Sequence, residues 1–273
     1  MRRALPAVLV HAALVLGALL TLAPLLWMVS ASFMPTGQAS TYPPPLLPSA
    51  PTLSHYADLF TRLDLARNFA NSLLVTAGVT LFSLVVNSMA GYAFAKLRFT
   101  GREATFRTLV AAMVVPAQVG MLPLFLIVKS LGLVNTPWGV MITGLATVFG
   151  IFMIRQFALS IPDDLLDAAR IDGASEWRIY WTIVVPVLKP ILVTMATFSF
   201  LSTWNDFMWP LIVLSDGSRY TLPVALANLV GEHVQDTELM MAGSVLTVLP
   251  VLVVFLVMQR SYVKGVLMGS VKG

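Results

Sequence analysis

The sequence contains no cysteine and little charge. The absence of cysteine from 273 residues excludes a disulfide framework, a thiolate metal site and a cysteine nucleophile. Charged residues make up only 11% of the chain, whereas soluble domains have about 25%. Hydrophobic residues make up 58%, and the mean hydropathy is +0.84. This composition indicates a protein that resides in a lipid bilayer.

Sequence motifs for catalysis and nucleotide binding are also missing. The chain has no G-x-x-x-x-G-K-[ST] phosphate loop and no H-E-x-x-H metal motif. The three histidines, His11, His55 and His233, are far apart in the sequence, and we expect His11 to be a packed or interfacial residue. We therefore expect no enzymatic activity, no cofactor and no metal in this chain. The net charge of +4 is small, and we expect no nucleic-acid partner.

What the chain does have is long apolar runs. A membrane-spanning helix needs about 20 mostly apolar residues. The first run, from Pro6 to Phe33, is longer than the apolar core of a signal peptide, so we expect it to be retained. We predict an all-α integral membrane protein that forms a single polytopic domain over residues 1–273. Its six predicted spans are approximately residues 7–31, 70–95, 107–128, 137–157, 187–214 and 240–259.

Basic residues in the connections predict the orientation of these spans. Thirteen of the 17 Lys and Arg residues fall on one side when the N-terminus is placed inside. Positively charged loops favour the cytoplasmic side of a membrane. We therefore expect a multi-pass membrane protein with both termini cytoplasmic; the resemblance described below implies that the membrane is the prokaryotic plasma (inner) membrane. The segments 34–67 and 215–239 then lie outside, where they either meet a partner or merely connect spans.

A charged segment at residues 160–186 interrupts the apolar sequence. Asp163 and Asp164 fall in the first turn of a predicted helix, where the helix dipole favours acids. Gly173 permits a left-handed exit from this helix, and Ser175 can cap a second one. The pattern predicts a helix, a turn and another helix on the cytoplasmic side. Such a unit is either a rigid plug for a partner or an interfacial loop that lies on lipid headgroups.

Polar residues at membrane depth suggest a second candidate site. Asp206 is the only acid that we place inside a span, and Pro210 cannot donate a hydrogen bond to its carbonyl. Trp204 and Trp209 offer flat faces that can stack on sugar rings, and Asn205 adds a polar group. These five residues form a candidate substrate pathway. The alternative is a proline kink beside an aromatic belt.

Three further asparagine and glutamine side chains fall within predicted spans. Asn71, Asn87 and Gln118 either line the pathway or form hydrogen bonds between helices. The sequence does not distinguish these two roles.

The charged segment resembles the loop that marks permease subunits of ABC importers. That loop reads E-A-A, then a glycine four residues on, and I-x-L-P after nine more residues. Here Asp167, Ala168 and Ala169 are followed by Gly173 and by Ile183, Val185 and Pro186, with aspartate and valine replacing glutamate and leucine. The resemblance implies that the segment docks on a separate ATPase subunit. The candidate coupling residues are Asp163, Asp164, Asp167, Ala168, Ala169, Arg170, Gly173, Ile183 and Pro186.

The resemblance extends over nearly the whole chain. Segments such as "GYAFAKLRFTGR" (91–102), "TWNDFMWPLIVL" (203–214) and "YVKGVLMGSVKG" (262–273) resemble the carbohydrate-uptake branch, and most of all the maltose-permease G type. The resemblance implies the fold of a type I ABC importer permease, six spans with a cytoplasmic helix–turn–helix coupling loop. It also implies a carbohydrate substrate, a related but non-identical second permease and an external solute-binding protein. Two ATPase subunits would bind the ATP and Mg.

A self-sufficient secondary transporter driven by an ion gradient is the alternative function. It would need ionisable residues within the membrane to couple ion and substrate movement. Asp206 alone is thin support for this function, and the charged loop would then have no role.

Overall fold

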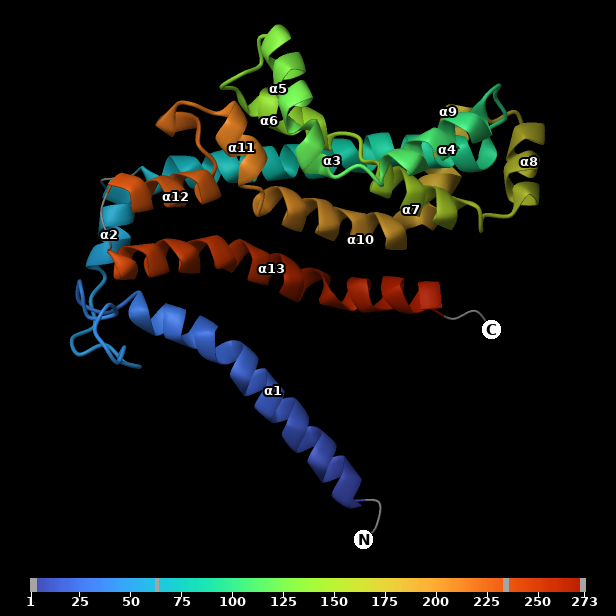
Figure 1. Ribbon diagram of the computed structural model, residues 1–273. Coiled ribbons are helices and arrows are strands. Elements are labelled where there is room, and N and C mark those ends of the chain that lie inside the picture. Colours follow the sequence, from blue (N-terminus) through green and yellow to red (C-terminus); the bar gives the residue numbers. More distant parts are fainter. Residues whose placement is uncertain (1–3, 62–63, 233–235, 271–273) are drawn as a thin grey trace. The chain divides into compact units, whose positions relative to one another are not determined.

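The computed structural model describes residues 4–61, 64–232 and 236–270, and the regular elements in these ranges are all helices (Figure 1). The chain forms two compact units, residues 1–66 with 222–250, and residues 67–221 with 251–273. The expectation of a single domain over residues 1–273 stays a prediction. Of the histidines, His233 lies outside the described residues.

The first unit contains three helices and the beginning of a fourth. Their bounds are α1 Ala4–Ala31, α2 Ser54–Thr61, α12 Leu222–Glu232 and α13 Thr237–Ser270, which continues into the second unit.

The second unit begins near the start of α3 and contains most of the helices. Their bounds are α3 Leu65–Lys96, α4 Arg102–Ala112, η1 Ala117–Gly120, α5 Met121–Ser130, α6 Pro137–Met141, η2 Ile142–Gly144, α7 Val148–Ala158, α8 Asp163–Ile171, α9 Glu176–Ile179, η3 Tyr180–Val184, α10 Val185–Trp204, α11 Met208–Val213 and η4 Gly217–Arg219. The segment η3 is a π-helical turn that joins α9 and α10.

Four helical stretches are long and apolar enough to cross a membrane, and two further pairs of helices qualify if each bent pair is one span. The four are Leu9–Ala31, Leu65–Lys96, Glu176–Trp204 and Thr237–Gln259. Six spans therefore fit the structure, as the sequence predicts. The third and fourth predicted spans, however, are bent pairs and not continuous helices.

The predicted third span, residues 107–128, is broken. Helix α4 ends at Ala112, and the chain resumes at Ala117 after a bend of 100°. Pro116 lies in the break. Its ring disfavours a helical conformation at the preceding residue, and it has no N–H to donate to the carbonyl of Ala112.

The predicted fourth and fifth spans are broken as well. In the fourth, η2 and α7 are separated at residues 145–147, and the bend is 41°. In the fifth, predicted at 187–214, the helix begins earlier, at Glu176, and ends at Trp204. The break at residues 205–207 precedes Pro210, so this proline falls in the first turn of α11, where its missing N–H costs no hydrogen bond. The expected kink at Pro210 is therefore a break.

In the first unit, the segment after α1 folds back onto buried polar groups. The main-chain N–H of Ala39 donates to Oε1 of Glu238 at 2.6 Å, at the beginning of α13. The ring Nε2 of His55, on α2, lies 2.8 Å from the carbonyl oxygen of Met34. Both Glu238 and His55 are buried. The described part of the predicted outer segment 34–67 thus includes α2 and is held by hydrogen bonds within the first unit.

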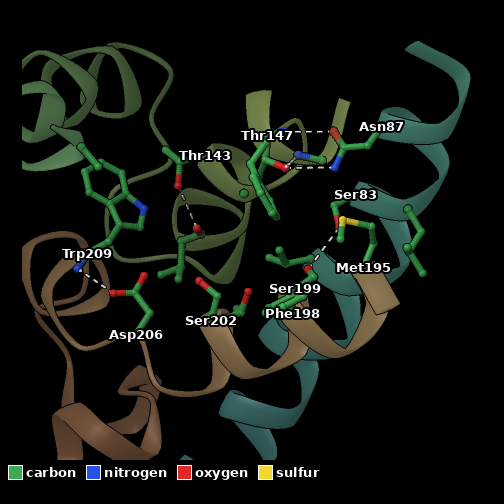
Figure 2. Close-up of a pocket in the computed structure, with 18 of the residues that line it drawn as sticks. Ser83, Asn87, Thr143, Thr147, Met195, Phe198, Ser199, Ser202, Asp206 and Trp209 are labelled. Carbon is green, nitrogen blue, oxygen red and sulfur yellow. Dashed lines mark hydrogen bonds between the residues drawn. The ribbon is translucent and has the colours of Figure 1, made fainter. Parts of the chain in front are cut away.

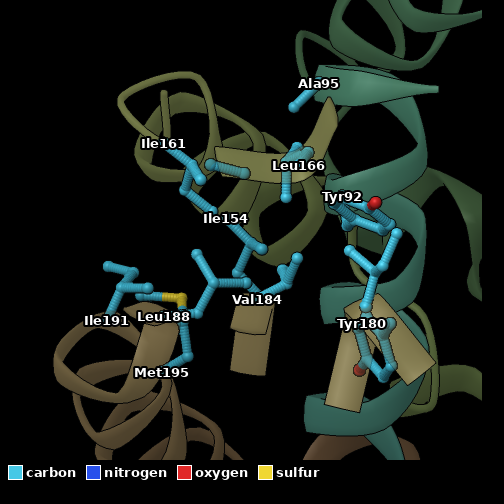
Figure 3. Packing of buried hydrophobic residues seen from close by; sticks show 12 residues of the cluster. Tyr92, Ala95, Ile154, Ile161, Leu166, Tyr180, Val184, Leu188, Ile191 and Met195 are labelled. Atoms are coloured by element: carbon cyan, nitrogen blue, oxygen red, sulfur yellow. The ribbon is translucent and has the colours of Figure 1, made fainter. Parts of the chain in front are cut away.

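In the second unit, α7 packs against both α3 and α10. The largest buried cluster joins Tyr92 on α3, Ile154 on α7 and Leu188 on α10 (Figure 3). Its members are Tyr92, Ala95, Ile154, Ala158, Ile161, Leu166, Ile179, Tyr180, Val184, Leu188, Ile191 and Met195. Leu166 and Ile179 belong to α8 and α9, so the charged segment is anchored in the same cluster.

We predict that Gly91 sets the distance between α3 and α7. A Cβ at this position would lie 2.7 Å from Cγ2 of Ile154 and 3.0 Å from the main-chain nitrogen of Arg155. Because the main chain cannot move aside, Gly91→Ala should destabilise the protein by about 1–3 kcal/mol. The measurement is the temperature at which the detergent-solubilised protein aggregates on heating, with size-exclusion chromatography as the readout of the protein that remains soluble.

The matched control is Gly17→Ala. Gly17 is also helical, and a Cβ there would meet nothing within 4 Å. Alanine favours a helix over glycine, so this variant should be at least as stable as the parent. Equal aggregation temperatures of the two variants would contradict the prediction that Gly91 sets the distance between α3 and α7.

Candidate functional site

The charged segment folds as a helix, a turn and a second helix, as predicted. Helix α8 follows Pro162, and its first turn carries Asp163 and Asp164. Asp163 Oδ1 accepts a hydrogen bond from Nζ of Lys96 at 2.7 Å, and this contact lowers the pKa of the Asp163 carboxyl. Lys96 also donates to the carbonyl of Ile161 at 2.6 Å. The end of α3 therefore holds the start of α8.

The turn after α8 depends on Gly173. This residue has a φ of +78°, a left-handed conformation that favours glycine. The N–H of Gly173 donates to the carbonyl of Arg170, and the N–H of Ala174 donates to that of Ala169, both at 3.0 Å. These are the two hydrogen bonds of a Schellman helix end. Ser175 Oγ then accepts the N–H of Arg178 and caps α9.

Arg170 joins the two helices. Its Nη1 donates to Asp167 Oδ1 and its Nε donates to Glu176 Oε1, each at 2.7 Å. The Glu176 contact, followed by the Asp167 contact, raises the pKa of Arg170 above its already high usual value. The other oxygen of Glu176 accepts from the hydroxyl of Tyr92, on α3, at 2.9 Å. The polar chain thus runs from α8 through α9 to α3.

The outer face of α8 is distinct from its anchored face. Leu166 is buried and Ala169 packs against the cluster of Figure 3. Leu165 and Ile171 are 44% and 87% exposed, and Ala168 is exposed as well. Leu165 and Leu166 are adjacent in the sequence, but the first is exposed and the second is buried. An apolar surface remains open on the outside of α8.

The two residues that end the motif lie in the next span. Ile183 is in the π-helical turn and packs against the buried cluster, whereas Pro186 is in the first turn of α10. The sequence predicts that this span begins near residue 187, but the helix begins earlier, at Glu176. The wide turn accommodates Pro186, which has no N–H to continue the α-helical hydrogen bonds.

A cavity of about 740 Å³ lies in the second unit (Figure 2). Residues of α3, η1, α5, α6, η2, α7, α10 and α11 contribute to its wall. Its polar lining residues are Ser83, Asn87, Gln118, Thr143, Thr147, Ser199, Ser202, Thr203 and Asp206. Most of the remaining wall is apolar, which is typical of sites for small organic ligands.

Asn87 holds the broken fourth span in place at the edge of this cavity. Its Oδ1 accepts the main-chain N–H of Thr147 at 3.0 Å, and its Nδ2 donates to the Thr147 hydroxyl at 3.2 Å (Figure 2). Thr147 Oγ1 in turn accepts the N–H of Gly150 and caps α7. Within a membrane, main-chain groups freed by a helix break need such partners. Asn87 therefore lines the cavity and also bonds between helices.

Three of the five candidate pathway residues line the cavity. They are Asp206, Trp209 and Pro210. Asp206 lies between α10 and α11, and its Oδ1 accepts the N–H of Trp209 at 3.4 Å, near the start of α11. Asp206 is thus placed in a helix break, whereas the sequence suggests a position inside a continuous helix.

Trp204 and Asn205 have other surroundings. Trp204 is only 1% exposed, and its ring contacts those of Phe69 and Phe200 at centroid distances of 5.5 and 5.8 Å. Asn205 Nδ2 donates to the carbonyl of Leu201. Neither residue is part of the cavity wall. The ring of Trp204 is therefore buried against Phe69 and Phe200, and the expectation that it offers a flat face to a sugar stays a prediction without support from this conformation.

The hydroxyl groups of the cavity wall were not identifiable as site residues in the sequence. Ser83 lies on α3, Thr143 on η2, and Ser199 and Ser202 on α10, and only the tertiary fold brings these three helices together. Hydroxyls in membrane helices commonly bond to their own main chain, so their presence alone predicts no site. Asn87 and Gln118 were the available signals, as amides at membrane depth that line the cavity.

The loop after α11 is fastened to two other parts of the second unit. Asn68 Nδ2 donates to the carbonyls of Gly217 and Tyr220 at 3.0 and 3.1 Å. Asn71 Nδ2 donates to the carbonyl of Ser218 at 3.0 Å. From the turn before α6, Asn135 Oδ1 accepts the N–H groups of residues 215 and 216. Asn71, which the sequence left between two roles, thus bonds to this loop.

The described residues contain no group of three or more His, Asp or Glu side chains that is suited to hold a metal ion.

We predict that Arg170 orders the charged segment because its planar guanidinium donates hydrogen bonds to Asp167 and Glu176 at the same time. Arg170→Lys keeps the charge but cannot reproduce the two directed hydrogen bonds. Because Arg170, Asp167 and Glu176 are all partly exposed, the substitution should lower the stability of the segment by about 1 kcal/mol or less. Amide hydrogen exchange over residues 163–180 should become several-fold faster.

The control for this prediction is Arg178→Lys. Arg178 is exposed, and its side chain forms no ion pair among the described residues. Equal exchange rates in the parent and in both variants would contradict the role of Arg170.

Comparisons with known proteins identify the family. The profile of the family described as "binding-protein-dependent transport system inner membrane component" matches residues 87–267. The Arabinooligosaccharides transport system permease protein AraQ of Halalkalibacterium halodurans is 37% identical over 253 residues, covering 92% of this chain and 91% of the relative. The Lactose transport system permease protein LacG of Rhizobium radiobacter is 34% identical and covers 100% of this chain and 98% of the relative.

A solved structure of similar shape supports the assignment. A chain of a bacterial ABC transporter involved in the import of the acidic polysaccharide alginate has a TM-score of 0.82 and 25% identity. The match covers 94% of this chain and 96% of that one. Family membership decides against a self-sufficient secondary transporter. The chain belongs to the inner membrane components of binding-protein-dependent transport systems, and it is a non-catalytic, multi-pass permease subunit of an ABC importer.

Proposed function

We propose that this permease subunit imports a carbohydrate and is driven through α8 and α9. The observation that carries the proposal is the rigid helix–turn–helix segment with the importer loop motif, anchored in the core of the second unit. The segment docks on a separate ATPase subunit, which binds the ATP and Mg. A related second permease, a second ATPase and an external solute-binding protein complete the transporter.

Relatives of the chain support the substrate class. Two are named for arabinooligosaccharides and lactose, and a third, from Bacillus subtilis, is the Melibiose/raffinose/stachyose import permease protein MelC, at 32% identity. All of these names describe oligosaccharides. We therefore propose an oligosaccharide as the substrate of this chain too.

The coupling surface is the outer face of α8. Leu165, Ala168 and Ile171 offer an apolar patch, and Asp164 adds a charge at its edge. Asp167 is engaged with Arg170, so its role is to hold the segment together more than to contact the ATPase directly. Ion pairs to Lys96 and Glu176 and the burial of Leu166 make the segment move as one body with the helices beneath it. A push on α8 is therefore transmitted to α3 and α10.

The substrate pathway includes the cavity of the second unit. We assign Asp206, Trp209 and Pro210 to its wall and give Trp204 and Asn205 structural roles. The loop after α11 lies on the external side in the proposed orientation. Because three asparagines fix its main chain, it offers a preformed contact surface for the solute-binding protein.

We predict that the conformation of Gly173, and not its size, is required for coupling. A Cβ at Gly173 would meet nothing within 4 Å, so a substitution acts through the φ of +78° alone. Gly173→Val should cost about 1–3 kcal/mol of backbone strain, because a β-branched residue resists a positive φ. The assembled importer should retain less ATPase subunit and lose most of its substrate-stimulated ATP hydrolysis and uptake.

Gly173→Asn is the matched control, since asparagine adopts the left-handed region more readily. It should keep most of the stimulated hydrolysis. If the valine variant retains a full ATPase complement and normal stimulated turnover, the segment is not the coupling element.

We predict that residue 172 faces the cytoplasm and residue 45 faces outward. The distribution of Lys and Arg between the two sides motivates this orientation. Reporter fusions after Pro45 and after Asp172 should therefore give opposite readings, external and cytoplasmic. The same reading at both positions would contradict the proposed topology.

A further inference from the structure

The cavity of the second unit has an unusual charge composition. Of the described residues in its wall, Asp206 is the one charged side chain, and none is a lysine, arginine or histidine. Asp206 is half-buried and accepts a main-chain N–H, while its neighbour in the wall, Ser202, is exposed (Figure 2). The cavity therefore presents negative charge that no cation of its own wall offsets.

The other polar residues of the wall are neutral, and several of them are held by hydrogen bonds. Ser83 and Ser199 contact each other through their hydroxyls at 3.2 Å, and Asn87 is held by Thr147 (Figure 2). Hydroxyl and amide groups both donate and accept hydrogen bonds. They therefore match the hydroxyl groups of a sugar without requiring a charge on it.

Two aromatic rings add an apolar surface to the same wall. Phe149 and Phe198 are 45% and 43% exposed and lie edge to face at 6.3 Å. Exposed ring faces can pack on the C–H faces of a sugar ring, as the wall of a ligand site usually combines apolar contact with a few polar groups.

We propose that this cavity is a saccharide compartment that accepts neutral sugars and disfavours uronates, with Asp206 as the residue that sets the preference. The inference rests on the proposed carbohydrate function and adds the charge class of the substrate. A uronate carboxylate in the cavity would meet a like charge in surroundings of low dielectric, and the wall contains no cation to offset the repulsion. The solved transporter of similar fold is involved in importing acidic alginate, so the two would differ in this preference.

The absence of cysteine from the chain permits a direct test. Ser202→Cys places a thiol of nearly the same size in the cavity wall. In the complete importer in detergent, labelling rates of this subunit are measured with a cationic and an anionic methanethiosulfonate reagent. Clefts of one charge sign concentrate the opposite ion, so the cationic reagent should be favoured by about tenfold.

Variants of Asp206 show whether the carboxylate causes this preference. Asp206→Asn in the Ser202→Cys background should abolish it, and Asp206→Glu should keep it. The ratio of the two labelling rates at Ser130→Cys, an exposed position at the end of α5 that is not part of the cavity wall, should not respond to Asp206→Asn. A ratio at Ser202→Cys that is unchanged by Asp206→Asn would overturn the inference.

A second measurement tests the saccharide itself. Neutral pentose and hexose oligosaccharides should slow the labelling of Ser202→Cys, whereas alginate oligosaccharides of equal length should not. Asp206→Asn should reduce the difference between the two classes. Protection by alginate equal to that by the neutral sugars, or no protection by any neutral sugar, overturns the proposed compartment.

The two proposals fail separately. ATP-dependent sugar uptake by the parent importer tests the proposed function, and it does not depend on the labelling ratios. Normal uptake with labelling indifferent to Asp206 would leave the importer function in place and remove the charge preference.

Discussion

The structure depends on one constraint, that main-chain N–H and C=O groups within a bilayer need partners inside the protein. Three of the predicted spans are interrupted, at residues 113–116, 145–147 and 205–207. At the second break Asn87 and Thr147 supply hydrogen bonds, and at the third the carboxylate of Asp206 accepts a main-chain N–H. Residues on both sides of the second and third breaks line the cavity, and at the first break Ala117 and Gln118, on its C-terminal side, do so. The polar groups of the cavity wall are thus partly the groups that make broken helices tolerable in lipid.

One helical stretch connects the two candidate sites. It begins at Glu176, which bonds to Arg170 of the charged segment, and ends at Trp204, after Ser199 and Ser202 in the cavity wall. At 1.5 Å per residue, its 29 residues extend about 43 Å. A displacement of α8 that tilts this helix therefore reaches the cavity without a separate relay. Gly91 allows α3 to lie in close contact with α7, so a displacement of one of these two helices is transmitted to the other.

The features that the sequence predicted correctly are those determined by residues close together in the chain, such as turns, helix caps and apolar spans. Gly173 and Ser175 specify the turn and the second cap by their own conformational preferences, so the helix–turn–helix form was predictable. Apolar runs likewise predicted the spans, and Pro116 gave a visible signal for one break. The break at 145–147 had no such signal, because Asn87, on another helix, stabilises it. Tertiary packing also decided that Trp204 is buried and that serines from α3 and α10 meet in one wall.

The π-helical turn at Tyr180–Val184 fixes the angular phase between the two ends of this long stretch. A π turn contains about one residue more than an α-helical turn. Each residue of an α-helix advances the direction of the side chains by about 100° around the axis. The extra residue therefore determines which way Glu176 and the charged segment point relative to Ser199 and Ser202. Deletion of one residue from this turn would keep the residues of both sites but would rotate one site about the helix axis relative to the other by about 100°.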